Sequence, residues 1–254
     1  MSTLENIALG IDIGGSSVKG GLVNLELGEL SSKKVKIPTP IKSSPQNIIK
    51  VIKEIINDLN IDKNIPVGVT VPAPVKNDVI ESMANLDSSW ANINLKKMIK
   101  EEIGIDAAIL NDADAAACAE LQYGRACGEK GLIFLSTLGT GIGTSLIHNG
   151  AVIVNTEFGH MDINGIEGEK IAAGSIKTKE KLNWDEWVER LQIYYSAIEK
   201  LFSPDLILIG GAISKEHRKF IPKLNLKTKV CPMKLKDNAE IIGIGYYSSK
   251  YNKK

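Results

Sequence analysis

The chain has 254 residues, of which 43% are hydrophobic and 24% charged, and 31 basic against 30 acidic side chains leave a formal net charge of +1. This length suits one large domain or two small ones. The near-neutral charge excludes the classes of protein that attract nucleic acid or an anionic membrane through a global positive field. A polyanionic ligand would therefore need a local basic patch.

Cysteine content and hydropathy exclude further classes of protein. The three cysteines, Cys118, Cys127 and Cys231, are too few and too scattered for a disulfide framework or a four-cysteine zinc site. No apolar stretch approaches the roughly 20 residues of a membrane span, and the first residues lack the pattern of a signal peptide. We therefore expect a cytoplasmic protein that binds neither a membrane nor nucleic acid.

The order of apolar runs predicts two similar α/β halves. In the first half we expect strands over residues 7–13, 20–25 and 35–37, a helix from Ser44-Pro45 to 59, a strand over 67–71, a helix near 95–103, a strand over 107–110 and an alanine-rich helix over 113–123. From residue 131 the hairpin recurs, and we expect a long amphipathic helix over 184–202, a buried strand over 206–209 and a helix over 213–220. Such alternation predicts sheets covered on both faces, with a ligand cleft between the halves.

A glycine-rich hairpin occurs twice, over residues 10–23 and 134–147. Each copy reads as an apolar strand, a tight turn that only glycine can make at several positions, and a second strand. Two such turns, facing each other across a cleft, could hold a chain of phosphates with backbone N–H groups. An ordinary hairpin turn is the alternative, because short glycine motifs are common.

Two charged residues flank the first turn. Asp12 lies within an apolar strand, where a carboxylate is costly to bury unless it serves a metal or a hydrogen-bond network. Magnesium fits, reached through water, because that ion keeps several of its waters. Lys19 is either a phosphate contact or a solvated lysine at the sheet edge, and the sequence leaves both readings open.

The polar run Asn111-Asp112-Ala113-Asp114 follows the strand over 107–110. Asn111 or Asp112 can cap the next helix. A carboxylate at this place can also accept a proton from a substrate hydroxyl, which makes Asp112 a candidate general base. We expect Asn111 to hold a neighbouring hydroxyl, and Asp114 to serve the cap or the helix surface.

A third cluster combines Glu157 and His160 in a glycine turn with Glu169 at the start of a predicted helix. These side chains offer acceptors and a donor suited to the ring hydroxyls of a sugar. Metal binding is the rival reading, but no cysteine lies nearby and a Glu-His-Glu set is a weak zinc site.

Together these motifs give the chain a resemblance to the ROK family of sugar kinases and repressors, in order along nearly its whole length. The segments that carry it are 12–15, 110–116, 137–143 and 157–160. Within the family the chain is most similar to the polyphosphate glucokinases, through segments 69–72, 85–90, 147–150, 155–160 and 177–179. The resemblance implies an α/β protein with the actin-like ATPase fold, built from two RNase H-like domains around a cleft. The expected domains are residues 1–110, with a C-terminal helix at about 238–254 packing back, and residues 111–237.

The resemblance also implies roles by position. Asp112 resembles the catalytic base. The positions that resemble sugar contacts are Asn85, Asp87, Asn111, Glu157, His160 and Glu169. Those assigned to phosphate are Asp12, Gly14, Gly15, Ser16, Lys19, Thr137, Gly139, Thr140 and Gly141, and Gly210 and Gly211 resemble the turn that contacts adenosine. Many members carry a zinc-binding cysteine cluster after the Glu-x-Gly-His turn, whereas segment 161–170 has no cysteine, so we expect no zinc.

The expected activity is transfer of the terminal phosphate of inorganic polyphosphate, with ATP as a second donor, to the 6-hydroxyl of glucose. The alternative is a strictly ATP-dependent kinase for glucose, mannose or an amino sugar. A repressor would need a helix-turn-helix module, for which the about six residues before the first strand are too few. A non-catalytic sugar-binding or assembly protein stays the other non-enzyme class. We expect a homodimer.

Two basic runs are candidates for guiding polyphosphate. The first contains Lys33, Lys34 and Lys36, and the second contains Lys177, Lys179 and Lys181. An ordinary solvated surface is the alternative for both.

Overall fold

A computed structural model describes residues 6–62, 64–80 and 87–251. The chain divides into two compact units, one made of Met1–Tyr123 with Asn238–Lys254 and the other of Gly124–Asp237. Among the described residues, no helix has the length and apolar character that a membrane crossing requires.

The first unit is built on a sheet whose strand order is β3-β2-β1-β5-β9, with β4 also paired to β2. Its strands are β1 (Ile7–Ile13), β2 (Ser17–Asn24), β3 (Glu29–Leu30), β4 (Val35–Pro38), β5 (Val67–Val71) and β9 (Ala107–Asn111). The β1–β2 hairpin is antiparallel, whereas β1, β5 and β9 run parallel. A smaller sheet joins β6 (Val75–Lys76), β7 (Val79–Ile80) and β8 (Ile93–Asn94), and the 3-10 turn η1 (Ser88–Trp90) precedes β8.

Helices cover both faces of this sheet, as the sequence predicts. They are α1 (Pro45–Leu59), α2 (Leu95–Ile103), α3 (Asp112–Tyr123) and α7 (Ala239–Tyr251). On one face α7 lies so close that a β-carbon at Gly10 would overlap the carbonyl oxygen of Ile241. On the other face a β-carbon at Gly20 would overlap the side chain of Ile55 in α1.

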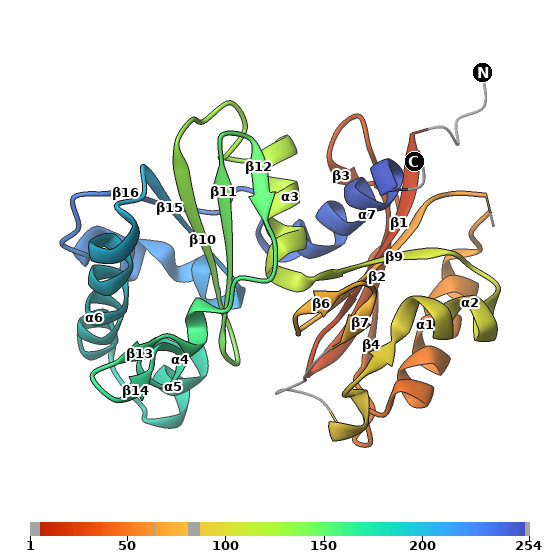
Figure 1. The fold of residues 1–254 in the computed structure, drawn as a ribbon, viewed down its shortest axis with the longest axis horizontal. Coiled ribbons are helices and arrows are strands. Elements are labelled where there is room, and N and C mark those ends of the chain that lie inside the picture. Colours follow the sequence, from red (N-terminus) through yellow and green to blue (C-terminus); the bar gives the residue numbers. More distant parts are fainter. Residues whose placement is uncertain (1–5, 63, 81–86, 252–254) are drawn as a thin grey trace. The chain divides into compact units, whose positions relative to one another are not determined.

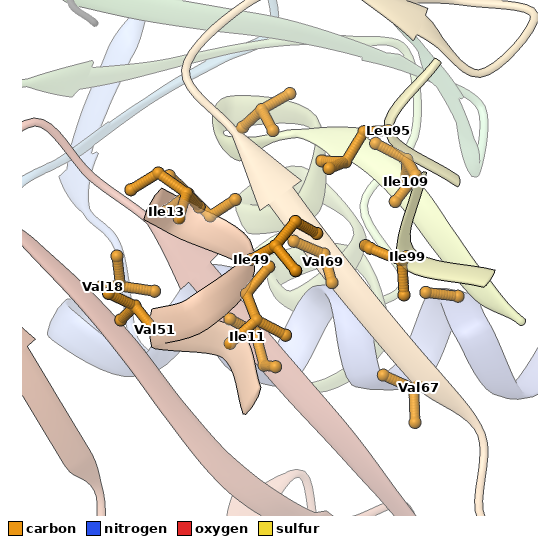
Figure 2. Close-up of a cluster of buried hydrophobic side chains, with 14 of the residues drawn as sticks. Ile11, Ile13, Val18, Ile49, Val51, Val67, Val69, Leu95, Ile99 and Ile109 are labelled. Carbon is orange, nitrogen blue, oxygen red and sulfur yellow. The ribbon is translucent and has the colours of Figure 1, made fainter. Parts of the chain in front are cut away.

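The core of the first unit lies on the α1 face. Figure 2 shows Ile11 and Val69 of the sheet meeting Ile49 of α1 and Ile99 of α2, all of them at most 2% exposed. On the α7 face, a β-carbon at Gly243 would overlap the carbonyl oxygen of Ala115 in α3. Because α3 packs this closely on α7, the division between the units follows Tyr123 instead of residue 110.

The second unit repeats the same plan. Its sheet has the order β12-β11-β10-β15-β16, with an antiparallel hairpin followed by parallel strands. The strands are β10 (Leu132–Leu138), β11 (Ile142–His148), β12 (Ala151–Ile153), β15 (Leu206–Gly210) and β16 (Lys229–Pro232). A separate small hairpin pairs β13 (Asp162–Ile163) with β14 (Ile166–Glu167). The repeated strand order confirms the predicted duplication.

Helices complete the second unit around the long α6 (Trp184–Phe202). The short helices are α4 (Gly168–Ala172) and α5 (Gly174–Lys179), and the 3-10 segments are η2 (Phe158–His160), η3 (Ala212–Lys219), η4 (Ile221–Lys223) and η5 (Lys236–Asn238). Asn183 caps α6 in a capping box with Glu186. The helix predicted over 213–220 is instead 3-10 in character, because the backbone leaves helical geometry at Glu216.

Candidate functional site

The first glycine turn joins β1 to β2 and is held in place by β4. The amide of Gly14 donates to the carbonyl of Ser17 at 3.1 Å. Thr39, just after β4, donates its hydroxyl to the Gly14 carbonyl at 2.6 Å and its amide to the Ser16 carbonyl at 3.2 Å. In the described part of the chain, the amides of Gly15 and Ser16 donate to no protein acceptor. Two exposed donors are therefore available at this turn for an anion.

The second turn joins β10 to β11 and is held from α5. Gly139 donates its amide to the Gly141 carbonyl at 3.0 Å. Ser175 donates its amide to the Gly139 carbonyl at 2.9 Å and its hydroxyl to the Thr140 carbonyl at 2.6 Å. Among the described residues no acceptor pairs with the amides of Thr140 and Gly141. The second unit thus presents the same kind of donor pair as the first.

The conformational reason predicted for these glycines is wrong. None of the glycines described in the two turns has a positive φ. The glycines instead leave room for neighbouring atoms. A β-carbon at Gly14 would lie 3.0 Å from the Ser17 carbonyl oxygen, and one at Gly141 would overlap the carboxylate of Glu169. A β-carbon at Gly139 would project into open space, so packing does not require glycine at that position.

Asp12 lies at the end of β1 in a polar network. Its carboxylate is 5% exposed and accepts hydrogen bonds at 2.9 Å from the Thr70 hydroxyl on Oδ1 and the Lys19 ammonium on Oδ2. Lys19 is therefore engaged with Asp12, not merely solvated. A carboxylate has about four acceptor positions, so the two bonds leave capacity for the waters of a hydrated magnesium ion. The residues present fit a cation reached through water.

Asn111 and Asp112 lie where β9 passes into α3. The side-chain oxygen of Asn111 accepts from the amides of Ala113 at 2.8 Å and Asp114 at 3.2 Å, so Asn111 caps the helix. The Asp112 carboxylate accepts from the Ala113 amide at 2.7 Å and stays partly exposed, whereas Asp114 is fully buried and not on the helix surface. The carboxylate of Asp112 therefore sits at the N-terminus of α3.

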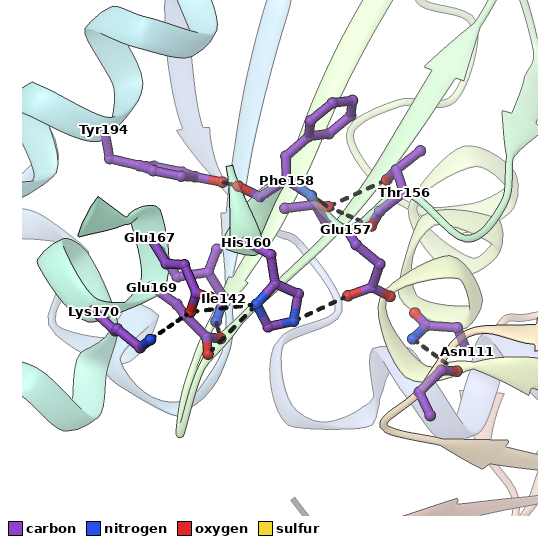
Figure 3. A network of polar contacts seen from close by, with 12 residues as sticks. Asn111, Ile142, Thr156, Glu157, Phe158, His160, Glu167, Glu169, Lys170 and Tyr194 are labelled. Carbon is purple, nitrogen blue, oxygen red and sulfur yellow. Dashed lines mark hydrogen bonds and ion pairs between the residues drawn. The ribbon is translucent and has the colours of Figure 1, made fainter. Parts of the chain in front are cut away.

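Three carboxylates surround the imidazole of His160 in the second unit (Figure 3). Nε2 of His160 lies 3.9 Å from Glu157, and Nδ1 lies 3.8 Å from Glu167 and 3.9 Å from Glu169. The predicted cluster of Glu157, His160 and Glu169 is thus brought together. Sequence reasoning missed Glu167, which joins it because the β13–β14 hairpin turns the chain back toward η2; its position two residues before Glu169 was the available signal.

The backbone around Glu157 is held rigidly. The Thr144 hydroxyl donates to the Thr156 carbonyl at 2.6 Å and accepts from the Phe158 amide at 3.0 Å. Tyr194 of α6 donates to the Phe158 carbonyl at 3.2 Å (Figure 3). These bonds come from the sheet and a long helix, so the cluster is positioned by the core of the unit.

The carboxylates of this cluster differ electrostatically. Burial raises the pKa of Glu157, an effect that the nearby His160 opposes and Glu169 reinforces. The hydrogen bond from Lys170 lowers the pKa of Glu167, with an ion-pair distance of 3.0 Å. Glu157 therefore takes up a proton at a higher pH than Glu167 does.

The same cluster has the composition of a weak cation site. Ligand atoms of His160, Glu167 and Glu169 all lie within 4.8 Å of one another. A nitrogen and two carboxylate oxygens are ligands that zinc accepts. The expectation that the protein carries no zinc therefore stays a prediction.

The remaining predicted positions lie elsewhere. Asp87 caps η1, accepting from the Ser89 amide at 2.9 Å. Its pKa is lowered first by the Ser89 side chain and then by this amide. Asn85 lies outside the described residues. Thr137 is half-buried in β10 opposite Gly143. A β-carbon at Gly210 would overlap the sulfur of Met233, and Gly211 has φ 82°, so both glycines also have structural reasons for their identity.

Comparison with known proteins decides the family, because the ROK family model matches residues 8–180. The chain belongs to the ROK family. A polyphosphate glucokinase of Mycobacterium tuberculosis (strain CDC 1551 / Oshkosh) is 41% identical over 243 residues, which cover 95% of this chain and 91% of that protein. The resemblance drawn from the motifs is therefore confirmed.

Solved structures agree with this assignment. The crystal structure of inorganic polyphosphate/ATP-glucomannokinase from Arthrobacter sp. strain KM superposes with a TM-score of 0.94 and 36% identity, covering 96% of this chain and 99% of that one. The ROK family glucokinase of Streptomyces griseus, solved with glucose and AMPPNP, has a TM-score of 0.81 at 20% identity, with coverage of 96% and 99%, and supports the fold alone. The predicted actin-like ATPase fold is confirmed.

Proposed function

We propose that this ROK-family protein transfers the terminal phosphate of inorganic polyphosphate to the 6-hydroxyl of glucose, with ATP as a second donor. The observation that carries the proposal is the similarity to a polyphosphate glucokinase along 95% of the chain. The geometry agrees with it, because each unit presents a glycine turn with two amides available for phosphate. The carboxylate of Asp112 supplies a proton acceptor.

In the proposed reaction, Asp112 is the general base. The 6-oxygen of glucose forms a bond to the terminal phosphorus while its proton passes to the Asp112 carboxylate. The bridging P–O bond breaks, and its electron pair leaves on the polyphosphate shortened by one phosphate. The exposed amides of the glycine turns are the donors expected for the phosphate groups, whose charge they would stabilise.

The Asp12 carboxylate would hold hydrated magnesium, which when bound would neutralise charge on the phosphates. Asp12 itself is fixed by Thr70 and Lys19, so its acceptor positions are oriented before any cation arrives. The proposed magnesium role rests on this fit and on the need of phosphoryl transfer for a divalent cation.

Glucose would be held by the acceptors and donors of the His160 cluster. We assign sugar hydroxyls to the side chains of Glu157, His160 and Glu169. Asn85, Asp87 and the side-chain amide of Asn111 are assigned to the sugar as well. The oxygen of Asn111 is occupied by the α3 cap, and its nitrogen donates to the Ala73 carbonyl at 3.3 Å. Its second amide proton is therefore the group that can reach a hydroxyl.

A coupled assay for glucose 6-phosphate tests the function. Polyphosphate, ATP and no donor are each supplied with glucose and with mannose. The proposal expects product from glucose with polyphosphate and, at a separate rate, with ATP. Product with ATP alone would identify a strictly ATP-dependent hexose kinase, and absence of product with both donors would contradict an enzymatic role.

Glucose affinity is expected to weaken on acidification because the Glu157 pKa is raised by burial. An acceptor carboxylate acts only when ionised, and a raised pKa means that protonation begins at a higher pH than for an ordinary glutamate. The KM for glucose should therefore rise as the pH falls toward the raised pKa. Glu157→Gln should raise KM about tenfold or more, the value of a hydrogen bond to a charged group, and flatten this limb of the pH profile.

Glu180→Gln serves as the control, since Glu180 is exposed and pairs with Arg190 at 3.4 Å. Its KM profile should match that of the wild type. An acid limb that persists unchanged in Glu157→Gln would remove Glu157 from sugar binding.

A further inference from the structure

The register of the first sheet aligns two lysines with Asp12. Asp12 of β1 pairs with Lys19 of β2, and Lys19 in turn pairs with Lys36 of β4. Directly paired residues of antiparallel strands place their side chains on the same face, with β-carbons about 4.5–5.5 Å apart. Asp12, Lys19 and Lys36 therefore form one row across three strands.

The row crosses from β1 to β4, and β4 itself leads away from the first glycine turn. Thr39, which holds the turn through Gly14 and Ser16, follows β4 directly. Lys36 lies three residues earlier, about 10 Å along an extended strand. Lys34 lies farther out, where its ammonium donates to the side chain of Asn238 at 2.8 Å.

The two lysines of the row differ in whether a carboxylate neutralises their charge. Lys19 forms an ion pair with Asp12 at 2.9 Å. Lys36 is exposed, and within residues 6–62, 64–80 and 87–251 no carboxylate forms an ion pair with it. A strand that leaves a phosphate-binding turn thus carries a positive charge that the protein does not neutralise.

The other basic run is less suited to an extended anion. Lys177 donates to the Leu182 carbonyl at 2.8 Å, and its ammonium lies 4.4 Å from the ring centroid of Trp184. Lys177 and Lys179 both belong to α5, where residues two apart do not share a face. This run therefore offers no continuous line of free ammonium groups.

We propose that the distal phosphates of a polyphosphate donor run along β4, past Lys36 and then Lys34, while its terminal phosphates occupy the glycine turn. This inference rests on the proposed function, in which polyphosphate is the donor. The ligand is a linear polyanion longer than three phosphates. We expect ATP and tripolyphosphate to depend less on this segment, hereafter the β4 lysine track, than long chains do.

The test compares Lys36→Glu with Lys50→Glu. Lys50 is an exposed lysine of α1, which covers the opposite face of the same sheet, so the charge change is matched. Lys36→Glu should raise the KM for long-chain polyphosphate by on the order of tenfold, the range of one charge-assisted contact. The KM values for ATP, tripolyphosphate and glucose should stay within about twofold, and Lys50→Glu should match the wild type for every donor.

A neutral variant tests whether the effect of Lys36→Glu comes from misfolding. Lys36→Ala should reduce the slope of log KM for long-chain polyphosphate against log salt concentration by about one, as for loss of one phosphate contact. An unchanged KM and slope for long chains would overturn the track, and so would an equal rise for ATP.

Direct binding separates this inference from the proposed function. Calorimetric titration of long-chain polyphosphate into the wild type and Lys36→Glu measures the track without turnover. If the wild type forms no glucose 6-phosphate from polyphosphate, the proposed function fails, while weaker binding to Lys36→Glu still supports the track. Equal binding to both proteins contradicts it.

Discussion

Replacing Asp112 with asparagine is expected to lower kcat by about 10² or more, the usual contribution of general-base assistance, with little change in the KM for glucose. Asparagine keeps the size of the side chain and an oxygen that can accept the 2.7 Å hydrogen bond from the Ala113 amide. The cap of α3 is also preserved, because Asn111 provides it. The substitution removes the negative charge and with it the capacity to accept a proton. Steady-state kinetics with saturating glucose measure the effect.

The matched control is Asp106→Asn, the same change at an exposed aspartate whose side chain lies 3.3 Å from Lys96. It should leave kcat within about twofold of the wild type. If Asp112→Asn turns over at a near-normal rate, another group must accept the proton, and the assignment of the base fails.

Gly243→Ala is expected to reduce the stability of the first unit by about 1–3 kcal/mol, because overpacking a close contact forces the backbone apart. The added methyl group would overlap the Ala115 carbonyl oxygen, and the next neighbour, the Ala119 β-carbon, would lie 3.2 Å away. Neither atom can move without displacing α3. The change would appear as a lower midpoint of thermal or urea unfolding.

Gly245→Ala in the same helix gives the graded comparison. Its β-carbon would meet the side chain of Val23 at 3.0 Å, which can shift more easily than a backbone carbonyl. The loss of stability should therefore be smaller. Equal stability of Gly243→Ala and the wild type would show that α3 and α7 are not packed as described.

Long elements with clear boundaries could be predicted from the sequence. Helix α2 spans Leu95–Ile103 as predicted, because Asn94 caps its start and Gly104 adopts φ 80° at its end. Helix α1 begins at the predicted Pro45. These helix-end signals depend only on residues next to each other in the sequence, so they can be recognised without knowledge of the folded structure.

Short or tertiary features could not be predicted in this way. Strands β6, β7 and β8 have two residues each, too few for any periodicity. Asn111 and Asp112 are both able to cap a helix, and only the folded backbone decides that Asn111 does so. Glu167 reaches His160 because the β13–β14 hairpin reverses the chain direction. Local residue preferences do not predict this contact. Gly14 and Gly141 leave room for neighbouring atoms, which the sequence does not place.

The position of α7 has a consequence for how the protein is made. Residues 124–237 form a contiguous unit, whereas the first unit needs α7, whose Ile241 and Ile244 are buried. During synthesis the whole second unit leaves the ribosome before residues 239–251 do. The N-terminal half therefore waits with one face of its sheet uncovered, and the usual order, in which the N-terminal domain folds first, is expected to be reversed.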